Sequence, residues 1–387
     1  MAAPGKGLSY DGGEAFGFSM DNQLQTRFGY LGGDVARDVT SFDVPRARTL
    51  LRGHAFKKSI QYYLQLDAVD DGLGTLTVNG PIKDAHITWN FIDDDSGTIG
   101  LRMGQGKTQF GLSGTGEARG LFFLERSAAA NGFSRARSTG AWVMGSHMEN
   151  KLRWSAGLMN GATAAGLGAG YVDVGEEAAN SDNEVNAVFT AEFDPMGDTT
   201  GGKGREYWYE GDFRTEDRGL QGSVRASLAI ENGKDTSAAA NDIEGIAFTI
   251  GTVWSIEGFQ FLGEWFTRTD EAQSTPADEE QPMGWSVQGV WVMPKSADAA
   301  IQWGFGARVC MVETDNGLTG SGVNFVTGLS GLGAVNGDST EVTLAANAFY
   351  HEHACKTTFE YTFQQVSPTG GTDLDNHIVG IGFQLLF

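Results

Sequence analysis

The sequence predicts an all-β protein, a 16-stranded antiparallel transmembrane β-barrel with a single domain over residues 1–387. The first observation behind this prediction is that large apolar residues alternate with small or polar ones, which suits strands with one face in lipid and one in water. The second is that short and long connections alternate between these strands. The third is the content of 56 glycines, because glycine permits the bends that a closed sheet requires.

The end of the chain shows the alternation most clearly. Counting back in twos from Phe387 gives Leu385, Phe383, Ile381 and Val379, and the residues between them are mostly small or polar. This pattern, together with an aromatic C-terminal residue, is typical of the closing strand of an outer-membrane barrel. The alternative is a half-buried terminal strand of a soluble β-sandwich.

Similar segments recur along the chain, most of them close to the length of about 9–11 residues that a barrel strand needs. In order, the predicted strands lie near residues 23–32, 44–54, 58–67, 82–92, 98–106, 139–148, 151–160, 184–193, 220–231, 243–254, 257–268, 283–292, 300–311, 340–350, 354–366 and 376–387. Their number is even, so both ends of the chain are expected on the same side of the membrane.

The connections between these strands alternate in length. Short ones are expected near residues 55–57, 93–97, 149–150, 255–256, 293–299 and 351–353, and long ones near 33–43, 68–81, 107–138, 161–183, 232–242, 269–282, 312–339 and 367–375. Short periplasmic turns and long external loops are typical of outer-membrane barrels. The connection 194–219 departs from this rule, since it is long at the position of a turn and carries an aromatic run from Tyr207 to Phe213. No pattern in the sequence explains it.

Composition excludes several classes of protein. The formal net charge of −22 argues against a nucleic-acid-binding protein. No apolar run approaches the roughly 20 residues of a transmembrane helix. The first residues lack the apolar core of a signal peptide, so the chain is expected to be either cytosolic or a mature form.

No catalytic constellation stands out, so the sequence predicts no enzyme, no catalytic residue and no cofactor. His351 and His353 have the spacing of a metal-binding pair on one strand face, but they lie at a predicted turn with no third ligand nearby. A polar turn is therefore favoured over a metal site. Cys310 and Cys355 are expected on different strands and on opposite faces, which argues against a disulfide.

The alternation also assigns charged strand residues to the inward face, where a barrel is polar. The inward bases are predicted to be Arg27, Arg46, Arg48, Arg52, Arg102, Arg153, Arg225, Arg268, Arg308 and Lys356. The inward acids are predicted to be Asp67, Glu192, Glu264 and Glu360. An acidic protein is thus expected to enclose a basic pore.

The long connection 107–138 is the candidate constriction loop. It carries an apolar run at 121–124, which is unsuited to a free external loop, and the bases Lys107, Arg119, Arg126, Arg135 and Arg137. Such a loop is expected to fold into the barrel, where rings of Arg and Lys favour anions. The alternative is that these bases pair with inward and loop acids and form a neutral, solvated network.

Several motifs give the chain a resemblance to a known family. These are residues 104–112 followed by 122–127, then 44–48, 62–67 and the Phe387 end. In these parts, and in order over most of its length, the sequence resembles the phosphate-selective porin O and P family. The resemblance implies a trimeric, sixteen-stranded outer-membrane channel in which arginines line the pore of the phosphate-selective members.

Two positions carry over from the family by motif, Arg46 on the second strand and Arg126 after the apolar run. Pro45 stands where phosphate-selective members have a second arginine, and the connection 232–242 lacks the arginines that those members supply from this region. The resemblance thus supports a porin more than it supports phosphate selectivity.

The function expected from these observations is that of an outer-membrane porin. It would give passive diffusion of small hydrophilic solutes with a modest preference for anions, phosphate-like ones among them, and its constriction would use Arg46, Arg48, Arg52, Arg102, Lys107, Arg126, Arg135 and Arg137. The alternative is a nonselective or cation-preferring general porin, in which the acidic mouths dominate. The expected partners are outer-membrane lipid, lipopolysaccharide and two further copies of the chain, in the outer membrane of a Gram-negative-type bacterium.

Overall fold

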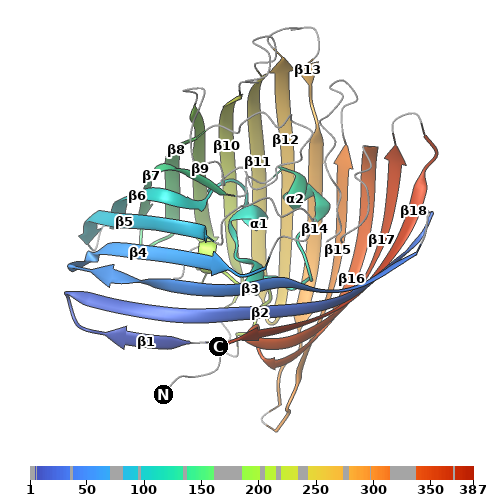
Figure 1. Ribbon diagram of the computed structural model, residues 1–387, viewed down its shortest axis with the longest axis horizontal. Coiled ribbons are helices and arrows are strands. Elements are labelled where there is room, and N and C mark those ends of the chain that lie inside the picture. The colour runs from blue at the N-terminus through green and yellow to red at the C-terminus, as the bar shows by residue number, and fades with distance from the viewer. Residues whose placement is uncertain are drawn as a thin grey trace.

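The structure of the protein is a computed structural model (Figure 1). It describes the chain except residues 1–4, 6, 35–37, 70–81, 95–96, 134–136, 161–184, 201–204, 215–218, 234–242, 273–278, 297, 314–336 and 369–370.

The described strands form a closed antiparallel barrel. Its sixteen wall strands are β2 (Phe16–Gly33), β3 (Val39–Ala55), β4 (Lys57–Asp67), β5 (Ile82–Asp94), β6 (Gly97–Lys107), β7 (Arg137–His147), β8 (Leu152–Asn160), β9 (Val185–Met196), β10 (Gln221–Gly233), β11 (Ile243–Ile256), β12 (Phe259–Ala272), β14 (Met283–Val292), β15 (Gln302–Glu313), β16 (Gly337–His351), β17 (Cys355–Pro368) and β18 (Leu374–Leu386). Two short strands, β1 (Leu8–Asp11) and β13 (Glu279–Glu280), pair with β2 and β12. Pairing of β18 with β2 closes the wall, and the predicted 16-stranded barrel is confirmed.

The predicted strands agree with the observed ones except near the start of the chain. There β2 begins at Phe16, seven residues earlier than residue 23, and β3 begins at Val39 rather than at residue 44. The proline in β3 sits at a register shift, because Gln25 pairs with Arg46 whereas Arg27 pairs with Asp43. A bulge of this kind accommodates Pro45, which cannot donate a ladder hydrogen bond.

The two faces of the wall differ as the alternation predicts. Apolar side chains such as Trp265 and Phe305 are exposed on the outside, as a surface that contacts lipid requires. The alternate residues, for example Glu264 and Arg308, are buried and polar, and they mark the inward face. Among the described residues, no helix is both long and apolar enough to cross a membrane.

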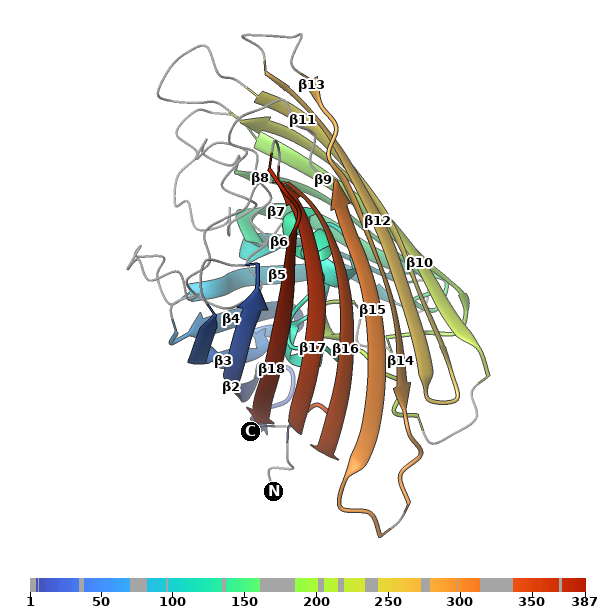
Figure 2. The same ribbon diagram turned by 90° about the vertical axis from the view of Figure 1, so that its right-hand side faces the viewer.

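Short connections gather at one end of the barrel, here called the turn end, which also holds the C-terminus (Figure 1). They join β3 to β4, β5 to β6, β7 to β8, β11 to β12, β14 to β15 and β16 to β17, as predicted. Figure 2 shows β14 to β18 side by side along one wall. The exception is again the connection between β9 and β10, which holds a short 3₁₀ helix, η3 (Arg205–Tyr207).

Candidate functional site: the lumen of the barrel

The connection after β6 lies against the inward face of the opposite wall. Its described part, residues 108–133, contains α1 (Leu112–Thr115), a 3₁₀ turn η1 (Ala118–Gly120) and α2 (Ala128–Phe133). Figure 1 shows α1 and α2 within the outline of the barrel. We call residues 108–133 the inner segment.

Hydrogen bonds attach the inner segment to inward residues of the wall. The carboxylate of Glu264 on β12 accepts the backbone N–H groups of Leu112 and Ser113. The carboxylate of Glu360 on β17 accepts the N–H of Leu124 at 2.8 Å. Each bond satisfies a main-chain donor that the loop cannot satisfy internally, and so fixes the segment in place.

Apolar packing holds the same segment. Phe122 and Phe123 are buried in a cluster with Val290 and Phe349 of the wall. The wall makes room with glycine: a Cβ added at Gly306 would lie 2.8 Å from the Phe122 ring. The apolar run that was unsuited to a free loop therefore has a core of its own inside the barrel.

The inner segment also lies across the seam where the first and last wall strands meet. The side-chain amide of Gln384 on β18 donates to the carbonyl of Arg119 at 2.9 Å. The Arg119 guanidinium pairs with Asp21 on β2 at 3.5 Å and with Glu117 in its own segment.

Most of the predicted pore bases are paired with carboxylates. The ion pairs are Arg46–Glu125, Arg48–Asp67, Arg52–Asp21, Arg102–Glu206, Arg137–Asp84, Arg153–Glu192, Arg153–Asp194 and Arg225–Glu192. Arg27 pairs with Asp43 and, at 3.4 Å, with Glu125. Arg268 is buried on β12, and Arg135 lies outside the described residues. The pairing alternative therefore holds for many of the inward arginines.

The predicted excess of ten wall bases over four acids is too large. Four further carboxylates are buried on the wall, those of Asp21, Asp84, Asp194 and Glu341. Asp21 escaped sequence reasoning because the start of β2 was not recognised. The others lie at alternating positions close to the predicted strand ends, where the assignment of a face is least certain.

Four predicted bases, Lys107, Arg126, Arg308 and Lys356, donate to main-chain carbonyls instead, and Lys356 donates to that of Leu121. Lys107 donates to the carbonyls of Thr115 and Gly116, at 3.1 and 2.8 Å. Arg126 donates to those of Ser113, at 2.9 Å, and Gly116. A carbonyl satisfies a donor without cancelling its charge, so the guanidinium of Arg126 keeps its positive charge at this edge of the inner segment.

Arg308 is the third of these bases. It donates to the carbonyl of Glu125 at 2.8 Å and lies 4.5 Å from the centre of the Phe123 ring. A guanidinium over an aromatic ring makes a favourable cation–π contact, and the arginine keeps its charge. Arg308 therefore helps to hold the inner segment through Phe123.

Glu125 is the carboxylate of the inner segment that pairs with Arg46 and Arg27. Burial raises the pKa of its carboxyl, but Arg46 and Arg27 beside it outweigh burial and hold the pKa below its usual range. Arg46 and Arg27 both pair with this carboxylate, and Arg27 pairs with Asp43 as well.

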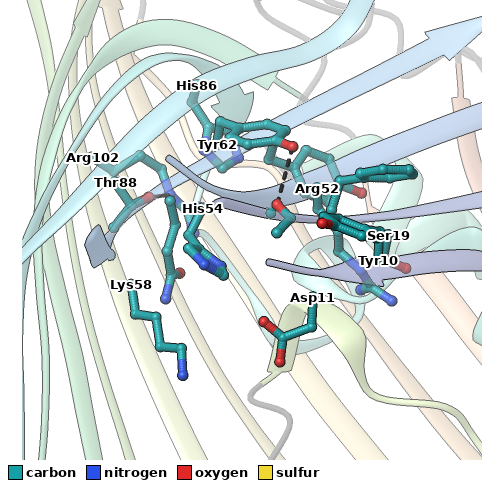
Figure 3. A pocket seen from close by; sticks show the side chains of 15 residues that line it. Tyr10, Asp11, Ser19, Arg52, His54, Lys58, Tyr62, His86, Thr88 and Arg102 are labelled. Atoms are coloured by element: carbon teal, nitrogen blue, oxygen red, sulfur yellow. Dashed lines mark hydrogen bonds between the residues drawn. The ribbon is translucent and has the colours of Figure 1, made fainter. Parts of the chain in front are cut away.

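A cavity of about 530 Å³ opens toward the turn end beside β1 to β6 (Figure 3). Its lining includes the basic side chains Arg52, His54, Lys58 and Arg102, and Tyr63, which stacks on His86 with 5.2 Å between ring centres. Space inside the barrel is thus found beside the wall that carries the paired arginines, and away from the wall that holds the inner segment.

The model of the family described as phosphate-selective porin O and P matches residues 18–291. The chain belongs to this family. The predicted resemblance is thus confirmed, and the protein is a porin, a passive channel of the outer membrane. A comparison with curated proteins found no match.

Several solved structures share the fold. The anion-selective porin from Comamonas acidovorans has a TM-score of 0.62 at 10% identity, with 96% of this chain and 100% of that chain covered. The outer-membrane channel DcaP of Acinetobacter baumannii has a TM-score of 0.59 at 11% identity, with 99% and 100% covered. OmpT of Vibrio cholerae in its trimer form has a TM-score of 0.57 at 12% identity, with 97% and 100% covered. At these identities the likeness concerns the porin fold.

Proposed function

We propose that this porin passes small hydrophilic solutes with a modest preference for anions, and that its narrowest part lies between the inner segment and the wall from β2 to β7. The observation that carries the preference is that Lys107 and Arg126 donate to carbonyls rather than to carboxylates. Fixed positive charge at a narrow point raises the local concentration of anions and repels cations.

Phosphate would be one of several anions that pass, rather than the single solute. A continuous row of unpaired arginines would favour phosphate, because arginine binds oxyanions through two donors. Here Pro45 interrupts that row beside Arg46, and Arg48 is paired with Asp67 at 2.6 Å. A general anion preference fits this arrangement better than a phosphate-specific site does.

A nonselective or cation-preferring porin is the second candidate. It is favoured by the net charge of −22 and by the paired state of most lumen arginines. In this case the acidic mouths would determine which ions enter.

The reversal potential in a planar bilayer under a KCl gradient separates the two candidates. We expect its sign to show chloride preference, and we expect the double variant Lys107→Gln, Arg126→Gln to lose most of that preference. Lys151→Gln is the matched control, because it removes a positive charge from an exposed turn. Cation preference of the unaltered protein would contradict the proposal, as would a double variant as anion-selective as the control.

We further propose that the protein is a homotrimer in the lipopolysaccharide-bearing outer membrane of a Gram-negative-type bacterium. The fold shared with porins that include a trimer form supports this assembly. Gentle extraction followed by electrophoresis without boiling should show a band near three times the mass of 41.3 kDa. A single band of monomer mass after cross-linking in the membrane would argue against the trimer.

A further inference from the structure

The long connection between β9 and β10 turns back into the barrel. Its described residues 205–214, here called the return segment, include Arg205, Trp208, Glu210 and Asp212, each buried to within 5% exposure. Other connections at the turn end, such as that between β11 and β12, need only a few residues. The additional length is therefore used inside the barrel and is not required to join two neighbouring strands.

Contacts with the turn end show where the return segment enters. The carboxylate of Asp212 accepts the N–H of Gly258, in the turn between β11 and β12, at 3.2 Å. The Nε2 of His353, in the turn between β16 and β17, donates to the carbonyl of Glu210 at 2.6 Å. His353, which the sequence placed in a polar turn, is buried and packs against Phe213.

The return segment is joined directly to the inner segment. Glu210 bonds to it twice, because its carboxylate accepts the N–H of Phe122 at 2.8 Å and its own N–H donates to the carbonyl of Gly120 at 2.7 Å. Trp208 packs in a buried cluster with Leu112 and the wall residues Val253 and Leu262. The two segments thus form one body on the inward face from β9 to β18.

One residue of the return segment also reaches the other wall. The carboxylate of Glu206 accepts two hydrogen bonds from the guanidinium of Arg102 on β6, at 2.6 and 3.0 Å. It accepts a third from the side chain of Gln109 at 2.5 Å. Burial raises the pKa of Glu206, but the charge and hydrogen bonds of Arg102 outweigh this effect and lower the pKa to about 2. Glu206 is therefore ionised under physiological conditions.

We propose that the return segment is a second pore-narrowing element, entering from the turn end, and that Glu206 sets the ion selectivity of the pore by cancelling the charge of Arg102. Arg102 lines the 530 Å³ cavity, where an uncancelled positive charge would act on passing ions. Because the return segment is joined to the inner segment, solutes pass both of them, and the two segments together determine the conductance. This inference rests on the channel itself and not on the anion preference proposed above.

The reversal potential in a planar bilayer under a KCl gradient tests the role of Glu206. Glu206→Gln keeps a side chain of the same size but leaves the Arg102 charge uncancelled, and we expect the ratio of chloride to potassium permeability to rise about twofold or more. The double variant Arg102→Gln, Glu206→Gln removes both charges and should return the ratio to near that of the unaltered protein. Glu257→Gln, in an exposed turn, is the matched control and should leave the ratio unchanged.

The pattern across these variants separates an electrostatic role from a merely structural one. A structural role would disturb the single and double variants alike, whereas an electrostatic role requires that the double variant recover. An unchanged ratio in Glu206→Gln, or a double variant that shifts as far as the single one, would overturn the assignment. The expected direction of the shift is the same whether the unaltered pore prefers anions or cations, so a failure here is distinct from a failure of the proposed anion preference.

Replacing residues 198–219 with a short glycine–serine turn tests the narrowing role. We expect the single-channel conductance to rise at least about twofold, because the barrel lumen is far wider than the path left beside a folded-in segment. A folded replacement, judged by heat-modifiable migration on a gel, with unaltered conductance would overturn the proposal. If the replacement does not fold, Glu210→Ala removes the acceptor of the Phe122 N–H. We then expect a larger and noisier single-channel current, and a current like that of the unaltered protein would count against the proposal.

Discussion

Inward carboxylates in this barrel hold main chain as well as arginine side chains. Glu264 accepts two N–H groups at the start of α1, and Glu360 accepts one from Leu124. The period-two alternation predicts which way such residues point, and it did so correctly for Glu264, Glu360, Arg48 and Asp67. It carries no information about the partners of Glu264 and Glu360, which lie on a segment more than one hundred residues away in the chain. The sequence predicted a basic lumen, where the structure shows a largely paired one, because four buried wall acids were not recognised.

The Glu264 contact leads to a prediction about stability. Glu264→Ala leaves the buried N–H groups of Leu112 and Ser113 without an acceptor, at a cost of about 1–3 kcal/mol for each group. We expect the temperature at which the folded gel band converts to the unfolded band to fall clearly. Glu264→Gln keeps one acceptor oxygen, so its conversion temperature should fall less. Glu257→Ala, in an exposed turn, should leave the conversion temperature unchanged. Equal losses in the Ala and Gln variants would contradict this account.

At the level of elements, strands were predictable and the packing of the inner segment was not. Each strand has a repeat that local sequence expresses, so most predicted boundaries agree with the observed ones within about three residues. The inner segment has no such repeat, and only its apolar run at 121–124 indicated that it is buried. The aromatic residues of the return segment were a similar signal. Their burial was not predicted, because the segment stands where a short turn was expected. An aromatic or apolar run in a connection therefore indicates that the connection folds into the lumen of a barrel.

The fit between the wall and the inner segment can be tested at one glycine. Gly306→Val on β15 adds atoms where a Cβ alone would be 2.8 Å from Phe122, so we expect the inner segment to shift and the single-channel conductance to change measurably. Because the ladder bonds of β15 involve only backbone, the barrel itself should still form. Gly289→Ala is the control, since a Cβ there meets nothing within 4 Å. Identical conductance in the two variants would argue against tight packing at this point.

For the whole molecule, net charge describes the exposed surface better than it describes the pore. Inside the barrel, carboxylates such as Asp67 and Glu192 are paired with arginines and add little to the net charge of −22. Other acids lie in the connections between strands. Replacing exposed acids should therefore change the entry of ions at low salt but have little effect above about 1 M salt, where charges are screened within about 3 Å. Bilayer selectivity measured at 0.1 and 1 M KCl should show this difference. A selectivity independent of salt would instead place the determining charges in the narrow part.

The position of the inner segment across the seam bears on how the barrel is assembled. Arg119 contacts β18 through its carbonyl and β2 through its guanidinium, so the first and last strands meet over a surface that the middle of the chain provides. If the wall closed first, Trp208 and Phe122 would have to enter the finished barrel from one end and pass the wall residues against which they pack. We therefore expect the wall to close after both segments have docked. The inner segment would then act as a template for the pairing of β2 with β18.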